Sequence, residues 1–282
     1  MIGRSQNVID GQALKINRAL LIRTETKFLV AEATARAISE RLAVLCERDE
    51  HTPAGARDYA SHSLYFDSPT RSLYRAKVLE LQRQLKLRVR YYDDGPVWLE
   101  VKRKDGELIT KSGCPLDRAR WPRVLQDYFT EKIPGLLAPN GFLDMIQQLG
   151  GEPVCRVHYR REAWVSLVDD DLRITFDRDL RAEPAWGDLS LSMDPSSAAL
   201  MDNPWDTHSA WGGSPVIMEI KTSKPVPAWM AALVDAFRLT PQGISKFAMG
   251  VEASDIRSPD LRTANTPWRP VPPTGAPALK AV

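Results

Sequence analysis

Cysteine is scarce in this sequence, and long apolar runs are missing. The three cysteines among 282 residues, Cys46, Cys114 and Cys155, lie far apart and form no CxxC spacing. This pattern argues against a disulfide framework and against a zinc site. No apolar stretch approaches the roughly 18 residues of a membrane span, and the first residues lack the charged and apolar blocks of a secretion signal. We therefore expect a cytoplasmic protein with no membrane span in this chain.

An excess of charge of one sign is missing as well. Lys and Arg number 38 and Asp and Glu number 36, which gives a formal net charge of +2. Overall charge therefore gives no reason to expect a nucleic-acid or membrane partner, and any basic site has to come from local sorting of charge. The Walker loop, GxSxG and HExxH motifs are also absent. P-loop, serine-hydrolase and zinc-protease functions consequently have no support.

Several short segments alternate between apolar and polar residues with a period of two, which is typical of β-strands. These segments are Ile22–Leu29, Ser61–Asp67, Lys86–Tyr92, Val97–Lys104, Val154–Leu167, Asp171–Arg181 and Val216–Lys221. Asp93–Pro96 and Asp169–Asp171 are short links rich in turn residues, as in antiparallel hairpins. Long helical crossovers do not separate most of the strands. A meander or barrel of antiparallel strands therefore fits better than a parallel sheet.

Other segments repeat with the period of a helix and would cover an apolar face of such a sheet. They are Thr34–Arg48, Trp121–Phe129, Phe142–Leu149 and Pro227–Phe237. Glu183–Ser214 has no sustained period and is interpreted as a long, partly packed insertion. The predicted fold class is α+β, an antiparallel β tunnel barrel covered by several helices.

Composition predicts one folded domain, over residues 21–255. Residues 1–20 are mixed and polar, and we expect a loosely ordered N-terminus there. Residues 256–282 carry repeated prolines among small residues. That composition is typical of a disordered tail.

Charged residues gather on one face of each predicted strand, because residues two apart on a strand share a face. Arg88 and Arg90, for example, share a face that excludes Leu87 and Val89. Over these polar faces, with Lys246 added, the basic residues outnumber the acidic ones by ten to four. The basic residues are Arg23, Lys27, Arg88, Arg90, Lys102, Lys104, Arg161, Arg173, Lys221 and Lys246, and the acidic ones are Glu25, Glu100, Asp177 and Glu219.

This ratio is far steeper than that of the whole chain, so the expected partner is a polyanion. One alternative is that these faces are the solvated side of ordinary antiparallel sheets. Like charges opposite each other on neighbouring strands are destabilising, however, unless water, carboxylates or a bound anion offset them. Arginine suits phosphate because its planar fork donates two parallel hydrogen bonds. The few carboxylates are then candidates for holding a divalent metal against the phosphates.

In their order along the chain, these charged segments resemble the VTC domain, the polyphosphate polymerase domain of the triphosphate tunnel metalloenzyme (CYTH-like) superfamily. The similarity runs from about Arg23 to Gly250. Its pieces are Arg23–Val30, Leu64–Pro69 with Tyr74, Leu87–Tyr92, Leu99–Lys104, Tyr159–Ala163, Leu172–Arg178, Met218–Lys221 and Ser245–Phe247. The wider superfamily often has Glu, Glu, Lys in its first strand, where this sequence has Arg23, Glu25 and Lys27. That difference resembles the polymerase branch, because it removes a metal ligand and adds a phosphate donor.

The resemblance implies a tunnel through which phosphate chains thread, with Mn²⁺ or Mg²⁺ at one side. The implied reaction transfers the terminal phosphoryl group of ATP to inorganic polyphosphate, with triphosphate as a related ligand, and it depends on positioning and charge neutralisation. The candidate catalytic residues are Lys27, Arg88, Arg90, Lys102 and Arg161. Candidate substrate-binding residues are Lys104, Tyr159, Arg173, Lys221, Ser245 and Lys246, and the candidate metal ligands are Glu219 and Glu25.

Two other functions stay open, a metal-dependent hydrolase of triphosphate or short polyphosphate and a non-catalytic polyphosphate sensor. Glu219 disfavours the sensor, because binding alone needs only cations, and the missing carboxylate at Arg23 disfavours the hydrolase. Single residues have structural alternatives as well. Glu219 could pair with an arginine across the barrel, and Lys246 could lie at a strand end in solvent. The rings of Tyr159 and Trp98 could stack on a base or simply pack.

Overall fold

The computed structural model describes residues 24–92, 95–106, 108–131, 138, 140–193, 198–201 and 214–255. The expectations for residues 1–20 and 256–282, and Arg23 of the predicted first strand, lie outside the described residues. No helix within these ranges has both the length and the apolar character needed to cross a membrane. The three cysteines are all buried, and none of them forms a disulfide.

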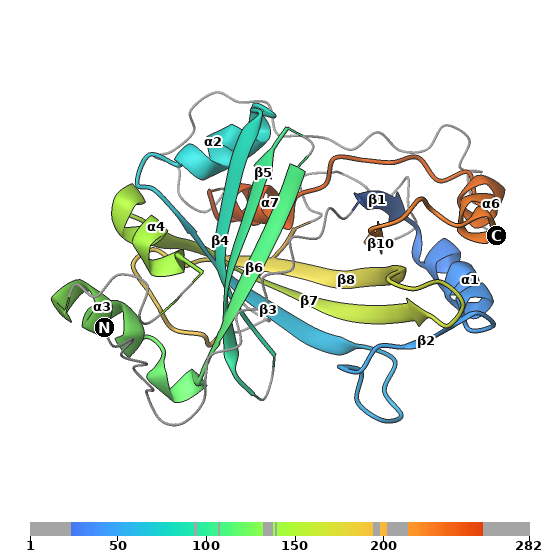
Figure 1. The fold of residues 1–282 in the computed structure, drawn as a ribbon, viewed down its shortest axis with the longest axis horizontal. Helices are drawn as coiled ribbons and strands as arrows, with labels where there is room; N and C mark the ends of the chain where they lie inside the picture. Colours follow the sequence, from blue (N-terminus) through green and yellow to red (C-terminus); the bar gives the residue numbers. More distant parts are fainter. Residues whose placement is uncertain are drawn as a thin grey trace, which may run out of the picture.

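One antiparallel sheet organises the described part of the chain (Figure 1). Its strands are β1 Thr24–Val30, β2 Cys46–Arg48, β3 Tyr59–Asp67, β4 Arg83–Tyr91, β5 Val97–Asp105, β6 Leu108–Leu116, β7 Glu152–Ser166, β8 Arg173–Pro184, β9 Ala199–Leu200 and β10 Val216–Thr222. The main order is β1-β10-β8-β7-β3-β4-β5-β6, with β2 beside β7 and β9 beside β8. Each of the seven predicted strands is confirmed, with ends that differ by a few residues, whereas β2, β6 and β9 were not predicted.

The helices are α1 Glu32–Leu42, α2 Ser72–Val78, the 3-10 helix η1 Arg118–Arg120, α3 Arg123–Glu131, α4 Phe142–Leu149, α6 Ala228–Ala236 and α7 Lys246–Asp255. The prediction for Phe142–Leu149 is confirmed residue for residue. The predicted helix Thr34–Arg48 is wrong in its last part, because the chain leaves the helix after Leu42. Cys46–Arg48 instead pairs with β7, so hydrogen bonds to a strand replace those of a further helical turn.

The sheet is strongly curled. Figure 1 shows β4, β5 and β6 crossing over β3, β7 and β8, so the two ends of the strand order face each other. The end strands β1 and β6 do not pair with each other in the described residues. The predicted α+β class with a curled antiparallel sheet is confirmed, and the curl has the form of a half-barrel.

Alternation along the strands gives the sheet one polar and one apolar face, and the apolar face carries helices. In β8, Ile174 and Phe176 are buried with Met218 of β10 in a core that also includes Ile38 of α1 and Met230 of α6. A second core joins β3, β4, β5 and β7 to α3, α4 and α7. Polar side chains line the concave face outside the part that α7 covers.

Helix α7 is the exception, because it packs against β7 and β8 on the concave side. Gly250 permits this approach, since a Cβ atom at this position would lie 2.6 Å from Val157 Cγ2 and 3.1 Å from Cys155 Sγ. Such contacts are too short for any side chain, so the helix needs a glycine at this position. Helix α7 therefore brings Lys246 and Phe247, at its start, to the wall of the concave space.

The described part of the predicted insertion packs on the sheet. Trp121 Nε1 donates to the carbonyl oxygen of Leu189 at 2.8 Å, and Arg156 Nε donates to that of Ser190 at 2.7 Å. Trp205 and Trp211 lie outside the described residues.

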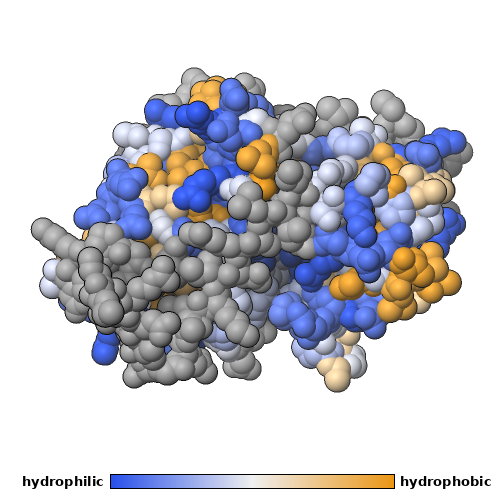
Figure 2. Space-filling model, in the orientation of Figure 1, coloured by the Kyte–Doolittle hydropathy of each residue, from blue (hydrophilic) through white to orange (hydrophobic). Residues whose placement is uncertain are grey.

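Figure 2 shows an apolar group of side chains on the surface of the molecule. It lies at the end where Figure 1 places α1 and the β7–β8 turn. That turn carries the exposed Leu167 and Val168.

Candidate functional site

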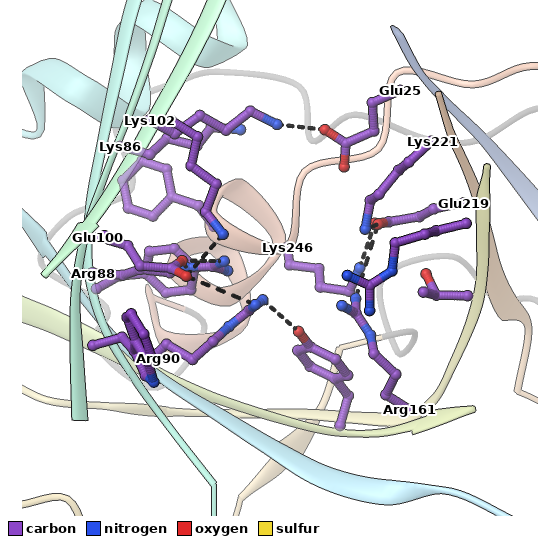
Figure 3. A pocket seen from close by; sticks show the side chains of 18 of the residues that line it. Glu25, Lys86, Arg88, Arg90, Glu100, Lys102, Arg161, Glu219, Lys221 and Lys246 are labelled. Atoms are coloured by element: carbon purple, nitrogen blue, oxygen red, sulfur yellow. Dashed lines mark hydrogen bonds and ion pairs between the residues drawn. The ribbon is translucent and has the colours of Figure 1, made fainter. Parts of the chain in front are cut away.

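The concave side of the sheet encloses a cavity of about 470 Å³, a size within the range of roughly 300 to 1,000 Å³ that is common for ligand pockets. Ten Lys or Arg side chains and three Glu side chains line it. They are Lys27, Lys86, Arg88, Arg90, Lys102, Lys111, Arg161, Arg173, Lys221 and Lys246, with Glu25, Glu100 and Glu219. Figure 3 shows two facing walls with Lys246 between them. The cavity is therefore strongly cationic in a chain of nearly balanced charge.

One wall consists of β4, β5 and β6. Arg88 lies directly opposite Glu100 in the β4–β5 register, and its Nε donates to Glu100 Oε2 at 2.6 Å. Lys111 of β6 contacts Glu100 Oε1 at 2.8 Å. Burial raises the pKa of the Glu100 carboxyl, but the cations of Arg88, Arg90 and Lys111 outweigh burial and hold this pKa well below its usual range. Glu100 is thus an ionised anchor for a wall that keeps an excess of cations.

The facing wall consists of β1, β10 and β8, and Arg161 of the adjacent strand β7 completes it. The register places Glu25 opposite Lys221 and Lys27 opposite Glu219, so acidic and basic residues alternate across β1 and β10. Lys27 Nζ lies 3.7 Å from Glu25 Oε1 and 3.6 Å from Glu219 Oε1. The two carboxylates therefore lie on either side of one ammonium group.

Glu219 is 3% exposed and has a cation on every side. Its Oε1 contacts Lys246 Nζ at 2.7 Å, and its Oε2 contacts Lys221 Nζ at 2.6 Å. Arg161 Nη2 is 3.9 Å away. Burial raises the pKa of this carboxyl, but the surrounding ammonium and guanidinium groups outweigh burial and hold the pKa well below its usual range. Glu219 is consequently ionised at neutral pH.

Asp177 of β8 fixes two of these cations, Arg161 and Lys246, from behind the cavity wall. It accepts from Arg161 Nε and Nη2, each at 2.7 Å, and contacts Lys246 Nζ at 2.6 Å. Lys246 is 7% exposed at the start of α7. The alternative that Lys246 lies at a strand end in solvent is therefore wrong.

Tyr159 lies between guanidinium groups of both walls. Arg90 Nη2 donates to its hydroxyl oxygen at 3.2 Å, and Arg161 Cζ is 5.1 Å from the centre of its ring. Burial raises the pKa of the phenol, but the charges of Arg161 and Arg90 outweigh it and lower the pKa of Tyr159 to about 7. This hydroxyl can therefore change protonation near neutral pH.

Three lysines of the cavity have lowered pKa values, because they are buried among other cations. Burial lowers the pKa of Lys86 well below its ordinary value, and the charges of Lys27 and Lys102 lower it further. Burial likewise lowers the pKa of Lys221 and brings that of Lys111 to about 8, although nearby carboxylates oppose the change. A bound anion would reverse these shifts, because an opposite charge favours the protonated amine. The electrostatics of the cavity thus favour a polyanion.

Most of the residues predicted from the sequence line this one cavity, and two do not. Lys104 lies on the same face of β5 as Lys102 but outside the cavity lining. Ser245 lies just behind the lining, where its Oγ accepts from Lys86 Nζ at 3.2 Å and from the backbone N–H of Ala248 in α7 at 3.3 Å. Ser245 therefore holds a cavity lysine and the first turn of α7.

Two lysines of the cavity were missed. Lys86 lies on the same face of β4 as Arg88 and Arg90, so the alternation that identified those arginines could have identified it. Lys111 lies on β6, where Gly113 and Pro115 interrupt the strand pattern. No local signal in the sequence marks Lys111.

The carboxylates of the cavity fit a divalent metal that binds together with phosphate. The described ranges contain no group of three or more His, Cys, Asp or Glu that could hold a metal ion by themselves. Mg²⁺, however, is commonly bound through one or two carboxylates plus substrate phosphates. Glu25 and Glu219 supply such a pair, and the neighbouring cations hold the pKa of each below its usual range despite burial. Both groups are thus in the deprotonated form that a metal needs.

The sequence matches one protein family. The model of the VTC domain family matches residues 22–254, which includes every element that lines the cavity. A comparison with curated protein sequences gives no significant match.

Solved structures that are similar to this chain have very different sequences. A candidate adenylate cyclase of Bacillus halodurans is 10% identical, with a TM-score of 0.46 over 78% of this chain and 92% of that chain. The PH1819 protein of Pyrococcus horikoshii is 13% identical, with a TM-score of 0.44 over 82% and 98% of the two chains. The Mimivirus capping enzyme triphosphatase is 8% identical, with a TM-score of 0.29 over 76% and 89%. These TM-scores are below 0.5, so the similarities carry no weight for function.

Proposed function

This chain belongs to the VTC domain family, and on that basis we propose that it is a metal-dependent polyphosphate polymerase, which transfers the terminal phosphoryl group of ATP to a polyphosphate chain. The family supports a reaction of triphosphate-like substrates. The observation that carries the proposal is the cavity itself, where ten cationic side chains surround three carboxylates. A linear polyanion matches this arrangement, because cations on both walls can contact its two sides.

The cations divide the work of holding the phosphates. Arg88, Arg90 and Lys102 bind phosphate oxygens from one wall, and Lys27, Arg161, Arg173 and Lys221 bind them from the other, with Lys246 between the walls. The guanidinium forks can donate two parallel hydrogen bonds to one phosphate, which orients it as well as neutralising it. Phosphoryl transfer depends largely on such positioning and charge stabilisation. Tyr159 adds a hydroxyl at the point where the two walls meet.

In the proposed reaction a terminal oxygen of the polyphosphate attacks the γ-phosphorus of ATP. The new P–O–P bond forms as the bond from the γ-phosphorus to the β,γ-bridging oxygen breaks, and ADP leaves with that electron pair. The attacking oxygen already carries negative charge. No side chain therefore needs to act as a nucleophile, and the cations of the cavity serve to bring two anions together.

Glu219, together with Glu25, is the proposed metal ligand of this chain. When held by these carboxylates, Mg²⁺ or Mn²⁺ would supply positive charge that neutralises the negative charge developing on the phosphates during transfer. Lys27, which lies within 4 Å of both carboxylates, offsets their mutual repulsion and favours their ionised forms in the free protein.

Phosphorus NMR tests the proposed function on the purified protein incubated with ATP and either Mg²⁺ or Mn²⁺, with the paramagnetic Mn²⁺ removed by a chelator before the spectrum is recorded. A polymerase should produce resonances of internal phosphoryl groups while the γ-phosphate signal of ATP declines. Orthophosphate as the sole new product would establish the hydrolase instead. Shifted ATP or tripolyphosphate signals with Mg²⁺, together with no turnover with either metal, would show that the domain only binds phosphate chains.

A further inference from the structure

Partly exposed aromatic side chains line one part of the cationic cavity. His51, Tyr59 and Tyr92 form a three-ring cluster, with ring centres 5.5 Å apart for His51 and Tyr92 and 5.7 Å apart for Tyr59 and Tyr92. All three line the cavity, and so does Trp98. We call these four residues the aromatic rim.

The strand register places the aromatic rim next to the phosphate-binding cations. Trp98 of β5 lies opposite Arg90 of β4, and Tyr92 follows Arg90 by two residues. Gly113 of β6 leaves room for the indole, since a Cβ atom there would lie 3.4 Å from Trp98 Cε3. The rim therefore continues the wall that carries Arg88 and Arg90 toward solvent.

The rim differs from the other aromatic residues of the cavity in its exposure. Tyr65 and Phe247 are 3% and 2% exposed and pack against each other, with ring centres 5.2 Å apart. They belong to the core behind the cavity. Tyr59, Tyr92 and Trp98 are only half-buried, and the His51 side chain is 50% exposed. Rings of the rim thus retain surface that a ligand can cover.

Tyr59 is held in its place by charged neighbours. Its hydroxyl donates to Asp49 Oδ2 at 3.1 Å, and the same oxygen accepts from Arg173 Nη2 at 2.9 Å. Arg173 lines the cavity. One hydrogen-bonded group therefore ties a ring of the rim to a cation of the phosphate site, which gives the two a fixed relative position.

We propose that the aromatic rim stacks on the base of a nucleoside triphosphate whose phosphates lie in the cationic cavity. This inference rests on the proposed function, which already names ATP as the donor, and adds the residues that would recognise its base. A base has a flat π-face on which aromatic side chains can stack, with little regard to which base it is. Inorganic tripolyphosphate has no such group. The rim consequently favours a nucleotide over a phosphate chain of the same length.

Affinities for ATP and for inorganic tripolyphosphate, measured side by side in the presence of Mg²⁺, test the inference. Trp98→Ala and Tyr92→Ala should each weaken ATP binding by roughly fivefold to a hundredfold, the range of one lost base–aromatic stack. Tripolyphosphate binding should change less than twofold, which also shows that the cavity is still folded. Trp98→Phe keeps a stacking ring and should recover most of the affinity for ATP. Phe129→Ala removes an exposed ring of α3 outside the cavity lining and should affect neither ligand.

Equal losses for both ligands in the rim variants would overturn the inference, and so would unchanged ATP binding in both of them. Either result leaves the proposed function standing, because tripolyphosphate binding by the wild type supports the phosphate cavity independently. If the wild type binds neither ligand, the proposed function and the inference are both contradicted.

Discussion

Lys102 of β5 and Glu25 of β1 form an ion pair, although 77 residues separate them and their strands lie near opposite ends of the sheet order. Curling of the sheet brings the two strands face to face across the cavity (Figure 3). The pair therefore spans the space in which we place the phosphates. A bound phosphate would compete with Glu25 for the Lys102 ammonium.

Lys102→Ala should weaken tripolyphosphate binding by roughly tenfold to a hundredfold, because a charge-assisted hydrogen bond contributes about 1.5 to 3 kcal/mol. The Lys102 side chain is 32% exposed, so the melting temperature should hardly change. Isothermal titration calorimetry and a thermal melt measure the two effects. Lys104→Ala is the matched control, since it removes the same charge from the same face of β5 outside the cavity lining. Similar losses in both variants would mean that only the general field of the wall matters.

Glu219→Gln should separate binding from turnover. The substitution keeps the shape but leaves Lys221 and Lys246 without their shared carboxylate, and removal of one partner from a buried pair costs about 3 to 5 kcal/mol. The free variant should melt earlier than the wild type, and tripolyphosphate should stabilise it more, because the anion replaces the lost charge. Metal-dependent turnover should disappear, since the metal has lost its ligand. Undiminished turnover of the variant would disprove the metal-binding role of Glu219.

Tyr159 should give the folded protein a tyrosine that ionises near neutral pH. Its folded pKa of about 7 is below the ordinary value of about 10, so the phenolate stabilises the fold. This contribution is complete above about pH 10 and is lost as the pH falls through about 7. This transition should appear in the tyrosinate absorbance of the wild type and should be absent from that of Tyr159→Phe.

Phosphate binding should oppose that ionisation. A bound polyanion disfavours the phenolate, so tripolyphosphate should raise the pKa of Tyr159 and bind more weakly as the pH rises past 7. Affinity measured on both sides of neutral pH tests this, and Tyr159→Phe should flatten the dependence. An equally steep dependence in the Phe variant would assign it to other groups, such as Lys111 or the phosphates themselves.

Ile220→Ala should destabilise the protein by about 2 to 5 kcal/mol. Ile220 is 3% exposed in the core beneath α1 and α6, on the opposite face of β10 from Glu219 and Lys221. Urea denaturation measures the loss. Val44→Ala is the control, because Val44 is 78% exposed and its truncation should change stability little. An unchanged midpoint for Ile220→Ala would contradict the assigned faces of β10.

The sequence predicts the strands and their polar faces well, because alternation is a local property of the chain. Arg173 and Thr175 line the cavity while Ile174 and Phe176 are buried on the other side, as their spacing indicated. Helix ends are less predictable. Cys46–Arg48 continues a helical pattern, yet its backbone pairs with strand β7 instead of forming another helical turn. Such competition depends on a partner more than 100 residues away.

The assembly of the site could be predicted only through the family resemblance. Alternation places Lys102 on a polar face but says nothing of Glu25 across the cavity, since that contact follows from the curl of the whole sheet. Ser245 and Lys246 show the same limit. Their short motif fits a strand end or a helix start, and only the packing of α7 through Gly250 decides between them.

The position of α7 also bears on when the site can exist during synthesis. Helix α7 is the last element that the structure describes, and β1, the first, pairs within the described ranges with β10 alone. Chains emerge from the ribosome N-terminus first. Glu25 and Lys27 therefore cannot take their places in the sheet until Val216–Thr222 has been synthesised, and Lys246 is synthesised later still. A nascent or prematurely terminated chain would therefore present the arginines of β4 without the opposing wall. Contacts of such long sequence separation form slowly, and the ability to grip a phosphate chain should be among the last properties that the polypeptide acquires.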